Sequence, residues 1–150
     1  MVNKTFIALL ALLLLTPDSV SSRRSELKEI EYVIENKIGT RVYWSWGDRL
    51  CEQGIYGYFS PPRNHIIMCQ RNHNYDLIEL ISTLKHEGWH AVQMRCNSGR
   101  AALSQDQLRP HLTDEVKHIL QYQYPIFQSY AEAEARVIEQ VPTSAWIRGV

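Results

Sequence analysis

The spacing of apolar residues predicts a helix, then short strands, then further helices. The first helix is expected from Glu26, with Ser25 as its cap, to a stop at Gly39. Its apolar face recurs at intervals of three or four residues and comprises Leu27, Ile30, Val33, Ile34 and Ile38. Beyond Gly39 this spacing is lost, so a different kind of element is expected there.

Three short runs rich in aromatic and β-branched residues follow, and they are typical of strands. They cover residues 42–46, 55–59 and 65–68. Turns are expected at Gly47-Asp48 and over residues 60–64, which contain two prolines. Successive short strands predict a small antiparallel meander with one face free to cover a helix.

Helical spacing returns after Asp76, which is the expected N-cap of a helix that continues to about Arg95. Gly88 lies inside this helix and lowers its helix propensity by about 1 kcal/mol relative to Ala, which predicts close packing against a neighbouring element. Two more helices are expected, one from Thr113 or Asp114 and one over residues 126–140. Residues 97–111 show no pattern that favours an element.

The first 22 residues have the layout of a secretory signal peptide. Lys4 precedes an unbroken apolar run from Phe6 to Leu15, and small residues at 20–22 provide a cleavage site before Arg23. Ten apolar residues are too few to span a membrane, which needs about 20 on a helix. We therefore expect a secreted or periplasmic protein whose residues 23–150 form a single domain and keep no stable membrane span after processing.

The charge and the cysteine content of the chain indicate which partners and which covalent links to expect. The chain has 16 basic and 16 acidic residues and no basic stripe, so a nucleic-acid partner is not expected. An exported chain with three cysteines is expected to form one disulfide and leave one thiol. Cys51 with Cys69 is the preferred pair because both flank strands, and Cys69 with Cys96 is the alternative.

The most specific motif is H-E-x-x-H, at His86-Glu87-Gly88-Trp89-His90. Two histidines four apart on a helix share a face, so both rings can bind one Zn²⁺ ion. Glu87 then lies beside a zinc-bound water and is the expected catalytic base. Trp89 is expected to be a packing residue.

A third ligand is expected from the helix over residues 126–140. Glu132 and Glu134 alternate with small residues, Ala131, Ala133 and Ala135, which would let this helix approach the motif helix closely. The two glutamates lie about 200° apart on a helix, so only one can face the metal. Spacing alone leaves both open.

H-E-x-x-H followed by a helical E-x-E-A element resembles the gluzincin metallopeptidases, in a minimal version. The resemblance implies an α+β, zincin-like fold: a small antiparallel sheet of about three strands packed on the active-site helix, with further C-terminal helices. It implies Glu132 as the third zinc ligand beside His86 and His90, with Glu134 as the alternative. Arg136 is a departure, because those families usually carry Asp or Asn there to support a motif histidine.

The function expected from these residues is peptide-bond hydrolysis of a peptide or protein substrate through a zinc-activated water. Residues 66–68 are expected to be an exposed strand that aligns the substrate by β-augmentation. Two alternatives remain open. One is a catalytically inactive, zinc-stabilised binding protein, and the other is a metal-free, disulfide-stabilised binding domain that uses its aromatic strands.

Overall fold

A computed structural model describes residues 17–123 and 126–150 of the chain, and it has an α+β architecture. In the described part, six α-helices accompany one three-stranded sheet. The strands are β1 (Arg41–Ser45), β2 (Gly57–Ser60) and β3 (His65–Cys69). The helices are α2 (Pro17–Val33), α3 (Leu77–Asn97), α4 (Gln105–Leu108), α5 (Asp114–Gln123), α6 (Ile126–Ile138) and α7 (Thr143–Gly149).

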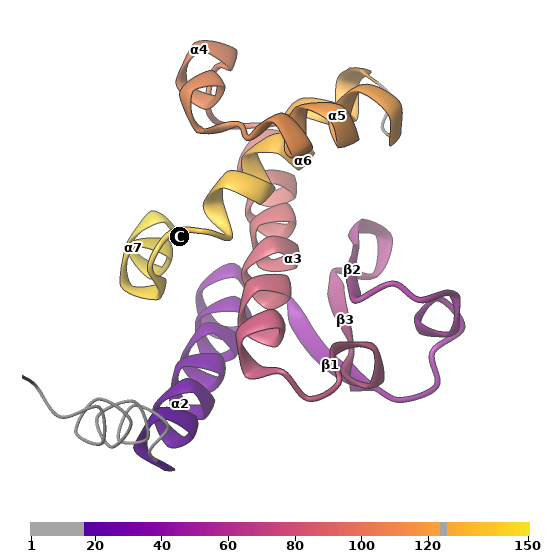
Figure 1. Ribbon diagram of the computed structural model, residues 1–150, viewed down its shortest axis with the longest axis vertical. Helices are drawn as coiled ribbons and strands as arrows, with labels where there is room; N and C mark the ends of the chain where they lie inside the picture. Colours follow the sequence, from indigo (N-terminus) through magenta and orange to yellow (C-terminus); the bar gives the residue numbers. More distant parts are fainter. Residues whose placement is uncertain (1–16, 124–125) are drawn as a thin grey trace, which may run out of the picture.

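Helix α3 is the central helix of the fold. It runs through the centre, with the sheet on one side and α2 and α7 on the other, while α4, α5 and α6 gather around its C-terminal end (Figure 1). The side chain of Asp76 accepts hydrogen bonds from the backbone N–H groups of Ile78 and Glu79, which confirms the predicted N-cap. Both motif histidines therefore sit on an element that is packed on several sides.

The first helix begins earlier than the sequence predicted. It starts at Pro17 rather than at Glu26, and residues 1–16, most of the expected signal peptide, lie outside the described part of the chain. Proline is well tolerated in a first turn, where its missing N–H would have no partner, and the small polar residues after it do not prevent a helix. The predicted stop is confirmed, because Gly39 ends the helical turn Ile34–Ile38 with a φ of 77°.

The sheet is mixed, so the predicted antiparallel meander is confirmed for the pairing of β2 with β3 and is wrong for β1. Its strand order is β1-β3-β2, with β1 parallel and β2 antiparallel to β3. A tight hairpin would have forced β1 and β2 to pair, but residues 46–56 form a long connection that carries β2 to the far side of β3. The free edges consequently belong to β1 and β2, and β3 is central.

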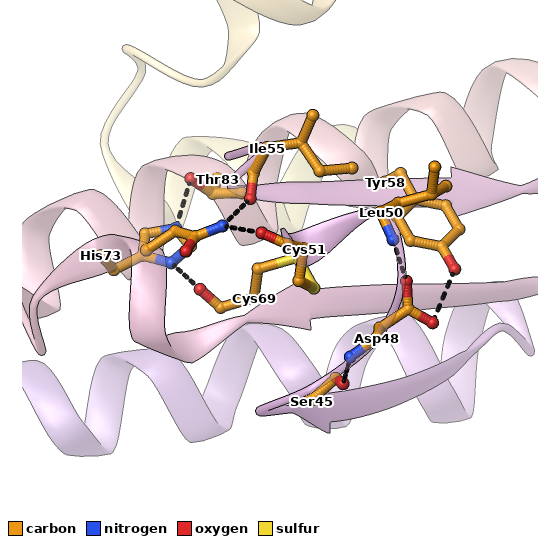
Figure 2. Close-up of a disulfide and its surroundings, with 10 residues drawn as sticks. Ser45, Asp48, Leu50, Cys51, Ile55, Tyr58, Cys69, His73 and Thr83 are labelled. Atoms are coloured by element: carbon orange, nitrogen blue, oxygen red, sulfur yellow. Dashed lines mark hydrogen bonds between the residues drawn. A yellow bond between two sulfur atoms is a disulfide. The ribbon is translucent and has the colours of Figure 1, made fainter. Parts of the chain in front are cut away.

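A disulfide ties this long connection to the end of β3. Cys51 and Cys69 are bonded with their Cα atoms 5.3 Å apart, which confirms the preferred pairing, and the exposed Cys96 is a free thiol. Around the bond, Asn72 donates to the carbonyls of Cys51 and Ile55 at 2.7 and 2.6 Å. Figure 2 shows the disulfide and the dashed hydrogen bonds to the carbonyl groups of Cys51 and Ile55.

Gly88 allows α3 to approach its neighbours closely, as its position in a helix predicted. A Cβ atom there would lie 2.8 Å from Cδ1 of Ile34 and 2.9 Å from Cζ2 of Trp146. The core around this point joins α2, α3, the sheet and α7. Trp89 is buried, as expected for a packing residue.

The C-terminal third contains two helices that were not predicted. Helix α4 lies in the segment without a pattern, and its first turn is held by a reciprocal capping box between Ser104 and Gln107. Helix α7 follows Pro142 and buries Trp146. No helix in the described ranges is both long and apolar enough to cross a membrane.

Candidate metal centre

Helices α3 and α6 bring three side chains with potential metal-ligand atoms together. The Nε2 atoms of His86 and His90, one helical turn apart, lie 3.1 Å from each other. Glu132 on α6 places Oε1 3.2 Å from Nε2 of His86 and Oε2 3.2 Å from Nε2 of His90. Ala133 and Ala135 are fully buried, in agreement with the close approach that their size predicted. The three side chains form a group that could hold a metal ion.

The other nitrogen of each ring has a partner that fixes its proton. Nδ1 of His86 lies 2.7 Å from Oε2 of Glu139, and Nδ1 of His90 lies 2.8 Å from Oε1 of Gln93. Both partners are oxygen acceptors, so each Nδ1 carries the hydrogen and donates it. The neutral form of each ring then has a bare lone pair on Nε2, which is the state that a metal ligand requires.

The close contacts within this group shift the pKa values of His86 and Glu132. Burial alone would lower the pKa of His86, but hydrogen bonds to Glu132 and Glu139 outweigh it and raise the pKa to about 10. Burial alone would raise the pKa of Glu132, but hydrogen bonds from His86 and His90 hold it far below its ordinary value. The group therefore favours a positive charge between its three converging atoms.

Glu87 is hydrogen-bonded to strand β2 and lines the same hollow as His86 and His90. Its Oε2 accepts a hydrogen bond from the backbone N–H of Phe59 at 2.8 Å. Burial raises the pKa of the Glu87 carboxyl, although the charges of His86 and His90 act in the opposite direction. The structure thus places Glu87 beside the histidines and outside the triad.

Glu134, the alternative third ligand, faces a different part of the molecule. It is fully buried and accepts hydrogen bonds from Gln93 and from the backbone of Ala102 and Leu103. This arrangement follows from helix geometry, because Glu132 and Glu134 point in nearly opposite directions. In the described part of the chain, the group of converging ligand atoms includes Glu132 and not Glu134.

Arg136 contacts a ligand and not a histidine. Its Nε lies 3.3 Å from Oε1 of Glu132, near enough for an ion pair, although the angle does not make a hydrogen bond. The carboxylate that contacts Nδ1 of His86 belongs to Glu139. Glu139 lies seven residues after Glu132, directly after the last residue of α6, and seven residues correspond to about two helical turns.

Two hollows meet at the candidate centre. The first, of about 430 Å³, is lined by the outer edge of β2, by Glu87 and by Arg136. The second, of about 210 Å³, is lined mainly by apolar groups, including Phe59, Pro61 and Met94. His90 and Glu132 line both hollows, so the candidate centre is open to solvent on two sides.

The strand that was expected to align a substrate has no free edge. Residues 66–68 belong to β3, which is central and buried, so that prediction is wrong. The edge that reaches the centre is β2. Sequence reasoning also missed Gln93, although its place three residues after His90 puts it on the same face of α3.

Comparisons with known proteins assign no family. No protein-family model matches the chain, no curated protein resembles it, and no solved structure matches its fold. The function is therefore inferred from the residues and their geometry.

Proposed function

We propose that this chain is an exported, zinc-dependent peptidase. The observation that carries the proposal is the convergence of His86, His90 and Glu132 beside Glu87, at the meeting point of two hollows. An H-E-x-x-H helix supplies two of the ligands and the carboxylate. The remaining ligand comes from a separate helix 42 residues after His90, at Glu132.

The spacing of the ligand atoms supports zinc as the metal. Ligand atoms about 2.0–2.1 Å from a tetrahedral zinc lie about 3.3 Å from one another. Here the Nε2 atoms of His86 and His90 lie 3.1 Å apart, and each lies 3.2 Å from a different oxygen of the Glu132 carboxylate. Structural zinc sites are closed by four protein ligands, whereas catalytic sites have three and keep one position open. The described residues provide three potential ligands, and an open cleft lies beside them. This arrangement favours a catalytic zinc site.

Zinc bound here would lower the pKa of a water molecule and polarise a peptide carbonyl. The chain's own contribution is a proton acceptor at the carboxylate of Glu87. The N–H of Phe59 orients this carboxylate, and burial raises its pKa above the ordinary value of a glutamate, which makes it a better proton acceptor. Glu87 would accept the proton of the attacking water and return it to the leaving amine.

The free backbone groups along the outer edge of β2 are evidence that the substrate is a peptide. Tyr56 directs its carbonyl to β3, so the alternation of an antiparallel strand directs the backbone of Gly57 and Phe59 outward. Phe59 confirms this direction, because its N–H reaches Glu87. The outward backbone of Gly57 and the carbonyl of Phe59 can then pair with an extended chain laid across the centre.

Export is supported by the disulfide. A Cys51–Cys69 bond is typical of an oxidising compartment, and the layout of residues 1–22 is typical of a secretory signal. Intact-mass analysis of the exported protein tests this part of the proposal. A mature chain that begins near Arg23 supports it, and a chain that begins at Met1 contradicts it.

The test of the activity is Glu87→Gln. In the zinc-loaded protein this change should abolish cleavage of a quenched-fluorescence peptide library and leave the zinc content unchanged, since Glu87 is not a ligand. Glu79→Gln is the matched control, because Glu79 is an exposed glutamate on the same helix. Cleavage that survives Glu87→Gln, or a zinc-loaded wild type that cleaves nothing in the library, would contradict the proposal.

A further inference from the structure

Glu134 is a fully buried carboxylate that lies outside the group of converging ligand atoms. Its partners in the described part of the chain are N–H groups: the side-chain amide of Gln93 at 2.7 Å, Leu103 at 2.8 Å and Ala102 at 3.0 Å. The first partner belongs to α3 and the other two to the segment before α4. A single carboxylate therefore joins the motif helix to a distant loop.

Gln93 is held in one orientation by this carboxylate. Its Nε2 donates to Oε2 of Glu134 and to the carbonyl of Ala131, and both are acceptors. The amide oxygen consequently points the other way, to Nδ1 of His90 at 2.8 Å. Gln93 is 2% exposed, so water does not compete for these bonds.

The orientation of Gln93 decides which nitrogen of His90 can bind a metal. An amide oxygen at Nδ1 accepts a hydrogen, so the lone pair of the neutral ring is on Nε2. A flipped amide would present its NH₂ group to Nδ1, and the ring hydrogen would then move to Nε2, where it would block coordination. The flip would also direct the amide oxygen at the carboxylate of Glu134, which opposes it.

We infer that Glu134 is a positioning residue for the metal centre. It acts through Gln93 to keep Nε2 of His90 free for a metal, and it couples this to the position of residues 102–103. The inference rests on the proposed metal function. His86 differs, because its Nδ1 reaches the carboxylate of Glu139 directly.

A double-mutant cycle on metal affinity tests the inference. Zn²⁺ affinity would be measured by chelator competition, and Co²⁺ absorption would report the ligand geometry, in wild type, Gln93→Leu, Glu134→Gln and the double variant. Gln93→Leu should weaken Zn²⁺ binding about 10- to 100-fold. Glu134→Gln should weaken it less, and the double variant should bind no more weakly than Gln93→Leu, since Glu134 acts through Gln93.

An exchange of the two side chains covers the case in which Gln93→Leu does not fold. In Gln93→Glu/Glu134→Gln the carboxylate lies beside His90 and the amide behind it, so Nδ1 still meets an acceptor. This pair should bind Zn²⁺ more tightly than Gln93→Glu alone, in which two carboxylates face each other. Lack of this rescue would contradict the inference.

The outcomes separate the inference from the proposed function. Wild type that binds neither Zn²⁺ nor Co²⁺ would overturn both. Wild type that binds Zn²⁺, with unchanged affinity and Co²⁺ spectrum in Gln93→Leu and Glu134→Gln, would overturn the positioning role alone. Losses that multiply in the double variant would also overturn it, because they would mean that Glu134 acts independently of Gln93.

Discussion

Histidine is buried in two regions of this molecule, and the regions differ in what the ring nitrogens meet. At the disulfide-tied end of the sheet, His73 donates from Nδ1 to the carbonyl of Cys69 at 2.9 Å, and its Nε2 lies 2.9 Å from the hydroxyl of Thr83 (Figure 2). Both nitrogens have neutral partners. Burial lowers the pKa of this ring, which is therefore held neutral.

At the candidate metal centre, only Nδ1 of each ring has an acceptor outside the converging group, which is Glu139 for His86 and Gln93 for His90. The Nε2 atoms of His86 and His90 converge on each other and on a carboxylate, and the pKa of His86 is raised. The comparison teaches that a buried histidine is a completed structural contact when both nitrogens are paired. It indicates a cation site when one nitrogen is fixed by an acceptor and the other converges with further acceptors.

The largest expected effect is the loss of stability of the metal-free protein in alkali. The pKa of His86 rises from an ordinary 6.5 to about 10 on folding, so its contribution is complete below pH 6.5 and is lost as the pH rises toward 10. Urea unfolding in EDTA should show the free energy of unfolding falling by about 1 kcal/mol per pH unit in this window. His86→Gln should remove most of this slope. A wild-type stability that is flat from pH 7 to pH 10 would contradict the comparison.

The next largest effect is the loss of stability when the disulfide near His73 is removed. Replacing both Cys51 and Cys69 by Ala should lower the free energy of unfolding by about 2–4 kcal/mol, because the bond restricts the unfolded chain. Metal content should not change, since the bond lies outside the ligand set. Cys96→Ser is the matched control and should stay within about 0.5 kcal/mol, because Cys96 is exposed and unpaired with another cysteine. A larger loss in Cys96→Ser than in the double variant would contradict the pairing.

A smaller effect is expected from His73→Leu. This change leaves the carbonyl of Cys69 and the hydroxyl of Thr83 without their partner, at a cost of about 2 kcal/mol. Because the folded state lowers the pKa of His73, wild type should also lose stability as the pH falls below 6.5, and this part of the loss should disappear in the variant. Thermal unfolding at pH 5 and pH 7 measures both. A loss of bound metal in His73→Leu would contradict the separation of the two regions.

Local patterns predicted most of the elements and the placing of His86 and His90 on one face of α3. The spacing of His86 and His90 needs only one helix, and the Asp76 cap and Gly39 stop depend on short segments. Cys51 with Cys69 was also favoured correctly, because both residues flank strands.

The features that the sequence did not predict depend on contacts between distant segments. The strand order is set by how residues 46–56 cross the sheet, and no local pattern encodes it. Gln93 and Glu139 lie at helical intervals from His90 and Glu132, but many polar residues share such intervals, and only the packing of α6 on α3 distinguishes these two. The N-terminal turns of α2 were missed because small polar residues suggested a processing site.

The most direct test of the central claim is the metal content of the purified protein after incubation with Zn²⁺, in wild type, Glu132→Ala and Glu134→Ala. Wild type should hold one zinc ion per chain, Glu132→Ala should hold none after exchange into buffer, and Glu134→Ala should keep zinc with reduced affinity. No zinc in wild type, or loss in Glu134→Ala with retention in Glu132→Ala, would contradict the assignment of His86, His90 and Glu132 as the metal centre.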